Sequence, residues 1–125
     1  MTSSRPAALI VEDQPFVGMV ASDILRESGF DTFHAYDAEA AAQMLDEHPE
    51  IEVVVTEAQL PGRVTGLELA RHVSARRPDV QLVVTGSGPD LHLGQVPNGA
   101  CVLRKPYATG ELQTLVAAKS LLADA

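Results

Sequence analysis

The chain has 125 residues, the size of one ordinary domain, and we expect residues 1–125 to fold as a single unit. Hydrophobic residues make up 46% of it and charged residues 21%, a composition that builds a core and excludes an intrinsically disordered protein. The formal net charge of −8 repels nucleic-acid phosphates and anionic lipid headgroups, so we expect neither direct nucleic-acid binding nor membrane binding. With a single cysteine, Cys101, and no long apolar segment, the chain is expected to be a cytoplasmic protein without a disulfide.

Five short apolar runs predict β-strands. They are Ala8–Val11, Asp31–Ala35, Val53–Val55, Gln81–Val84 and Cys101–Leu103. Several runs are apolar without alternation, as expected of parallel strands that are buried on both faces. The segments between the runs are long enough for the crossover helices that parallel strands require.

Helical periodicity follows the first two of these strands. The first helix is predicted to begin near Pro15 and to stop at Gly29. Apolar residues at three- and four-residue spacing give this helix one buried face: Val17, Val20, Ala21, Ile24 and Leu25. The second helix is predicted to be capped by Asp37 and to end before Pro49.

Two further helices are predicted, with an irregular segment between them. The third helix opens with the capping-box pair Thr65 and Glu68 and ends near Arg77. The last helix has Thr109 as its expected cap. Its apolar residues are Leu112, Leu115, Val116 and Leu122. Glycine and proline residues in the segment Gly86–Ala100 leave room for only about one or two helical turns, so a fourth helix there is expected to be short or absent.

This alternation of strands and helices predicts an α/β fold. The simplest arrangement is an open, doubly wound sheet of five parallel strands with helices on both faces. In such sheets the functional site lies beyond the carboxyl ends of the strands, where residues far apart in the sequence meet.

Polar side chains follow four of the five predicted strands. Glu12 and Asp13 follow the first, Glu57 follows the third, Thr85 ends the fourth, and Lys105 follows the fifth. Each residue taken singly is typical of a helix cap, a turn or a solvated charge. Together at one edge, the carboxylates favour Mg²⁺, and a metal beside a hydroxyl and an ammonium can hold a phosphoryl group. The sequence therefore predicts a phosphoryl site at this edge.

Four segments carry these residues: LIVEDQ, VVVTEAQLPG, QLVVTG and RKPY. At these spacings, and over nearly its whole length, the chain resembles the receiver domain of two-component response regulators. The resemblance implies the flavodoxin-like receiver fold and a non-enzymatic role in a phosphorelay. It also implies partners, namely a histidine kinase or phosphotransfer protein and a downstream regulator protein, and leaves pairing with a second copy open.

The resemblance also assigns roles to individual residues. It implies that four residues hold Mg²⁺: Glu12, Asp13, Glu57 and, through its carbonyl, Gln59. It implies that the acceptor at position 57 takes a phosphoryl group. Thr85 is then the switch hydroxyl, and Lys105 is the ammonium that senses the phosphate.

Glu57 is the main departure from the family, whose acceptor is an Asp. The extra methylene moves the carboxylate by about 1.3 to 1.5 Å, and a displacement of about 1 Å at a reacting centre can lower a rate roughly 100-fold. We therefore expect phosphorylation to be altered or absent. A longer carboxylate that reaches Thr85 and Lys105 would hold the domain partly switched on, although a charge of about −1 imitates a phosphoryl group only in part. The family's switch aromatic is also missing, because Val102 stands at its position.

Three functions are open at this point. The first is a receiver-like signalling module, and the second is a phosphorylation-independent pseudo-receiver that serves only as a docking scaffold. The third, a Mg²⁺-dependent phosphohydrolase, is disfavoured because the chain has no Asp-x-Asp pair and no general base apart from the metal carboxylates. The 4 histidines share no metal-ligand spacing, and we expect them to be surface or structural residues.

Overall fold

The computed structural model describes residues 5–87, 91 and 93–124, and among these it leaves out the side chains of residues 93 and 117–124. The elements in chain order are β1 (Ala7–Val11), α1 (Pro15–Glu27), β2 (Asp31–Ala35), α2 (Ala38–Glu47), β3 (Ile51–Glu57), α3 (Gly66–Arg76), β4 (Gln81–Gly86), the 3₁₀ turn η1 (Leu93–Gln95), β5 (Cys101–Arg104) and α4 (Thr109–Asp124). The predicted apolar side chain of Leu122 lies outside the described part. None of the helices in the described residues is long and apolar enough to cross a membrane.

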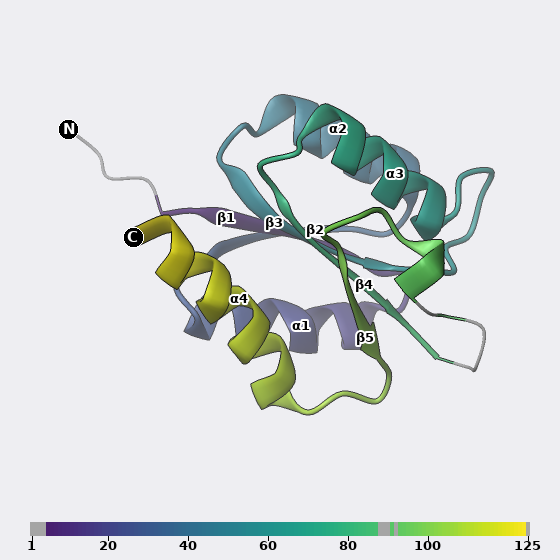
Figure 1. Cartoon of the computed structure of the whole chain (residues 1–125). Coiled ribbons are helices and arrows are strands. Elements are labelled where there is room, and N and C mark those ends of the chain that lie inside the picture. The colour runs from purple at the N-terminus through teal and green to yellow at the C-terminus, as the bar shows by residue number, and fades with distance from the viewer. Residues whose placement is uncertain (1–4, 88–90, 92, 125) are drawn as a thin grey trace.

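The five strands form one parallel sheet in the order β2-β1-β3-β4-β5. Helices α2 and α3 cover one face of this sheet, and α1 and α4 cover the other (Figure 1). This is the doubly wound α/β arrangement predicted from the sequence. All five strands point the same way, so the segments that follow β1, β3, β4 and β5 meet at one edge.

The core explains why the strand sequences are apolar without alternation. In β1, Leu9 and Val11 belong to the apolar cluster beneath α2 and α3. Their neighbours Ala8 and Ile10 belong to the cluster beneath α1 and α4. Each residue of β1 therefore meets a helix layer on whichever face it points to, and a polar residue there would be buried without a partner on either side.

Three of the four predicted helix starts are confirmed. Asp37 accepts from the backbone N–H of Ala40 at 2.8 Å and caps α2. Thr65 and Glu68 form a reciprocal capping box at α3, in which each side chain accepts from the other residue's N–H at 3.1 Å. Pro15 lies in the first turn of α1.

The start of α4 differs from the prediction. Thr109 is the first residue of the helix and not its cap. The carboxylate of Glu111 accepts from the N–H of Ala108 at 2.9 Å, so a side chain inside the first turn satisfies the backbone just before the helix. Between β4 and β5, η1 (Leu93–Gln95) is the only helical turn among the described residues, which confirms the prediction of a short fourth helix.

The predicted apolar face of α1 is only partly correct. Ala21, Ile24 and Leu25 are buried against the sheet as expected. Val20, however, is 42% exposed, and its neighbour one turn earlier, Phe16, is 76% exposed. Both side chains line a pocket at the carboxyl edge of the sheet instead of packing on its face.

Candidate functional site

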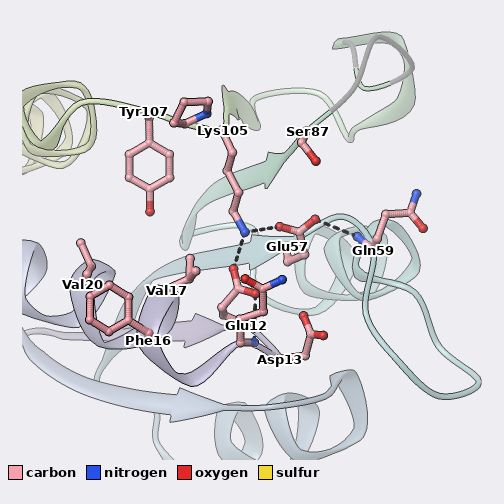
Figure 2. Close-up of a pocket in the computed structure, with 12 residues that line it drawn as sticks. Glu12, Asp13, Phe16, Val17, Val20, Glu57, Gln59, Ser87, Lys105 and Tyr107 are labelled. Carbon is pink, nitrogen blue, oxygen red and sulfur yellow. Dashed lines mark hydrogen bonds and ion pairs between the residues drawn. The ribbon is translucent and has the colours of Figure 1, made fainter.

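A pocket of about 630 Å³ opens where the strands end, at the edge predicted from the topology. It combines a polar floor with an apolar wall (Figure 2). The lining residues are Glu12, Asp13, Gln14, Phe16, Val17, Val20, Glu57, Gln59, Ser87, Lys105, Pro106 and Tyr107. Five of the six predicted site residues are therefore in one pocket. The sixth, Thr85, is buried beside Glu57.

Lys105 lies between two carboxylates at the floor of the pocket (Figure 2). Its Nζ is 2.5 Å from Oε1 of Glu12 and 2.6 Å from Oε2 of Glu57. Both carboxylates are buried, with Glu12 4% and Glu57 8% exposed. Burying a carboxylate is costly unless it is paired, and here one ammonium serves two of them.

The remaining carboxylate oxygens also have donors. The backbone N–H of Gln14 donates to Oε2 of Glu12 at 3.2 Å, and the N–H of Gln59 donates to Oε1 of Glu57 at 3.4 Å. The hydroxyl of Thr85 lies 3.5 Å from Oε2 of Glu57, which is at the outer limit of a hydrogen bond. The ammonium is therefore the main partner of Glu57, and the hydroxyl is a weak second one.

The charges of the pocket keep Lys105 protonated. Burial works to lower the pKa of its ammonium, but hydrogen bonds to Glu12 and Glu57 and their negative charges outweigh it, and the pKa is raised above its ordinary value of 10.5. Burial also raises the pKa of Tyr107 above 10.0, against the opposing charge of Lys105. The ammonium is thus a permanent positive charge at neutral pH.

The end of β3 is held so that Glu57 points into this pocket. Gly66 packs directly on the Glu57 backbone, because a Cβ atom at Gly66 would lie 1.6 Å from the Glu57 carbonyl oxygen. The N–H of Gly66 donates to the carbonyl of Ala58 at 3.0 Å, and the N–H of Ala58 donates to the carbonyl of Thr85 at 2.8 Å. Only glycine leaves room for this approach of α3 to the end of the strand.

His34 supports the acidic segment from the neighbouring strand. Its Nε2 lies 3.0 Å from the carbonyl oxygen of Glu12, and its ring stacks on Tyr36 with centroids 4.3 Å apart. A Cβ atom at Gly18 would lie 2.1 Å from this ring, so α1 and β2 approach closely only because Gly18 has no side chain. The sequence indicated a surface or structural histidine but not its contact with Glu12. This contact could have been found from the position of His34 in β2. His34 pairs there with Ile10 of β1, and Ile10 lies two residues before Glu12.

The apolar wall was not predicted as part of the site. Phe16, Val17 and Val20 come from the first turns of α1, and Tyr107 comes from the segment after β5 (Figure 2). Tyr107 could have been included because it follows Lys105 by two residues. Helical periodicity instead assigned the α1 valines to the core, because it cannot tell where a helix passes the end of the sheet.

Magnesium is the cofactor that the sequence suggests for this pocket, and its donors can be compared with the geometry. Mg²⁺ requires oxygen ligands at about 2.0 to 2.1 Å in near-octahedral geometry. Here Lys105 lies between Glu12 and Glu57, while Asp13 is exposed. Within the described part of the chain, no group of three His, Cys, Asp or Glu side chains could hold a metal ion. The donor types suit Mg²⁺, but their arrangement does not fit the ion.

An open parallel sheet in the order β2-β1-β3-β4-β5, with its site at the carboxyl edge, defines the flavodoxin-like class of doubly wound α/β domains. The chain matches the family model of the response regulator receiver domain over residues 8–117, and it belongs to that family. Receiver domains are signalling modules of two-component systems. They generally bind Mg²⁺ at the acceptor site and interact with kinases and downstream effectors.

Solved structures of receiver domains share the fold. A response regulator receiver domain protein from Clostridium thermocellum superimposes with a TM-score of 0.84 at 19% identity, covering 94% of this chain and 96% of that one. The signal receiver domain of an HD domain-containing protein from Pseudomonas fluorescens Pf-5 gives 0.83 at 24% identity, covering 94% and 95%. The receiver domain of NtrX from Brucella abortus gives 0.79 at 24% identity, covering 91% and 97%. At these identities the likeness concerns the fold alone.

Proposed function

We propose that this chain is a receiver-type signalling protein that acts through protein–protein contacts in a phosphorelay. Phosphorylation is altered or absent because Glu57 stands where the family has its acceptor Asp. Its partners are a histidine kinase or phosphotransfer protein and a downstream regulator protein, and the role requires no catalytic activity of the chain itself.

The contact between Lys105 and Glu57 is the observation that carries this proposal. In the family, the residues that Lys105 and Thr85 resemble respond to the phosphoryl group. Here the ammonium already lies 2.6 Å from a Glu57 oxygen, and the Thr85 hydroxyl lies 3.5 Å from the same oxygen. The longer side chain thus engages the sensing residues without phosphate.

The charge of Glu57 limits how far this engagement goes. A phosphoryl group carries about −1.5 to −2 and three strong acceptor oxygens, whereas a carboxylate carries about −1 and two oxygens. The short contact to Lys105 and the long contact to Thr85 agree with a partial imitation, in which the ammonium is held and the hydroxyl is not drawn in. The domain would therefore rest in a partly switched state.

Intact mass spectrometry tests the phosphorylation part of the proposal. The wild type, Glu57→Asp and Glu57→Gln are incubated with Mg²⁺ and acetyl phosphate. We expect a phosphoryl adduct on Glu57→Asp only, because shortening the side chain by one methylene restores the position of the attacking carboxylate. An adduct on the wild type that is lost in Glu57→Gln would instead make Glu57 a working acceptor.

Glu52→Asp is the matched control, because Glu52 is an exposed residue of the same strand and receives the same change. No adduct is expected on this variant. If neither Glu57→Asp nor the wild type is modified, the pocket is not a phosphoryl site and the docking-scaffold function is favoured.

Amide chemical shifts test the partly switched state. Glu57→Gln removes the charge that holds Lys105 but keeps the side-chain length, so we expect shifts at the ends of β4 and β5 to move together. Changes limited to residues that touch position 57 would show that the carboxylate has no effect on the surface that partners bind.

A further inference from the structure

Two buried carboxylates of the pocket share one counter-charge. Glu12 and Glu57 come from different strands, and their Oε1 and Oε2 atoms lie 2.5 and 2.6 Å from the same Nζ of Lys105. Figure 2 shows the ammonium pointing down between them. The space between the two carboxylates is therefore already occupied by a positive group of the chain.

A divalent cation placed between these two carboxylates would displace Lys105. Mg²⁺ must approach its carboxylate oxygens to about 2.0 to 2.1 Å, and it would then lie within a few ångström of the Lys105 ammonium. The two positive charges would repel each other at this distance, beside two buried carboxylates. An ion held by both glutamates would bind only after Lys105 had left Glu12, and the buried carboxylates would lose the ammonium that compensates their charge.

We propose that Lys105 takes the place of a divalent cation in this pocket, so that the site is charge-compensated by the chain itself and does not depend on Mg²⁺. The Glu57 side chain brings its carboxylate to 2.6 Å from the ammonium, which Glu12 also contacts. The inference goes beyond the signalling role. It rests on contacts within the chain itself, and these contacts involve neither a partner nor a phosphodonor.

Binding of Mn²⁺, measured by the electron paramagnetic resonance of the free ion without any phosphodonor, tests the inference. The wild type is compared with Lys105→Met, which keeps an apolar stem but removes the ammonium. We expect Lys105→Met to bind Mn²⁺ at least about tenfold more tightly than the wild type, the scale of one close charge pair. Arg71→Met removes the same charge from an exposed position on α3 outside the pocket and should bind like the wild type.

A second variant keeps the inference testable if Lys105→Met does not fold. Glu57→Asp draws the carboxylate back from the ammonium and frees an oxygen, so it should also bind Mn²⁺ more tightly than the wild type. Glu52→Asp, on the same strand but exposed, should leave the affinity unchanged. Circular dichroism establishes which variants are folded.

Equal Mn²⁺ affinity in the wild type and in Lys105→Met would overturn the inference, because the ammonium would then not compete with the metal. If only Glu57→Asp folds, equal affinity in that variant and the wild type would overturn it in the same way. Since no phosphodonor is present, this outcome is distinct from failure of the phosphorylation experiment.

Discussion

The Nζ atom of Lys105, which follows β5, lies 2.6 Å from Oε2 of Glu57 at the end of β3, although β4 separates the two strands in the sheet. An Asp at position 57 would end one methylene earlier, further from this ammonium. The same nitrogen also contacts Glu12, so the two carboxylates and the ammonium form one connected group. A substitution of any one of these three residues should therefore change the contribution of the other two to the free energy of unfolding.

Gly66→Ala should destabilise the protein strongly. Its Cβ atom would lie 1.6 Å from the carbonyl oxygen of Glu57, a backbone atom that cannot rotate away. We expect a loss of about 3 kcal/mol or more in the free energy of unfolding, measured in urea.

Gly110→Ala is the matched control, since Gly110 also lies at the start of a helix and an added Cβ there meets nothing within 4 Å. It should stabilise the protein by about 0.5 to 1 kcal/mol. Similar effects at the two glycines would contradict the close packing of α3 on β3.

Gly18→Ala should be rescued by His34→Ala. The new Cβ would lie 2.1 Å from the His34 ring, which is held by the Glu12 carbonyl and by stacking on Tyr36. We expect Gly18→Ala alone to lower the free energy of unfolding by about 1 to 3 kcal/mol. In the double variant part of this loss should be recovered, because the ring is gone and alanine favours the helix. Strictly additive losses would mean that the two residues do not touch.

The fold could be predicted because its determinants are local. Apolar runs mark the strands, and caps such as Asp37 and Thr65 bond only to residues three positions along, so short-range patterns contain them. The parallel sheet then follows from the order of the elements, and the carboxyl edge brings the site residues together.

The detailed contacts of the site could not be predicted, because they depend on how elements pack. Lys105 and Glu12 are separated by 93 positions, and the sequence does not indicate which carboxylates the ammonium contacts. Val20 has the helical spacing of a core residue, yet it lies beside the pocket and is exposed. Likewise, the role of Gly66 appears only when α3 is packed against the end of β3.

Titration of Tyr107 reports on the pocket directly. Burial raises its pKa above 10.0, while the charge of Lys105 opposes that rise. Because the folded state holds the phenolic proton more tightly than the unfolded state, the resulting stability is present below pH 10.0 and is lost as the pH rises through the folded pKa.

The chain has 2 tyrosines and 0 tryptophans, so a Tyr36→Phe background leaves a single tyrosinate absorbance to follow. We expect its midpoint above 10.0, and a further rise when Lys105→Met removes the opposing charge. A midpoint that does not respond to Lys105→Met would place the phenol outside the influence of the ammonium.

The most direct measurement of the central claim is a double-mutant cycle between Lys105 and Glu57. Unfolding in urea is measured for the wild type, Lys105→Met, Glu57→Gln and the double variant. Lys105→Met alone leaves two buried carboxylates uncompensated and should lower the free energy of unfolding by about 3 kcal/mol. In the Glu57→Gln background the same change should cost about 1 to 3 kcal/mol less. An equal cost in both backgrounds would show that the ammonium and the carboxylate do not interact, and would contradict the account.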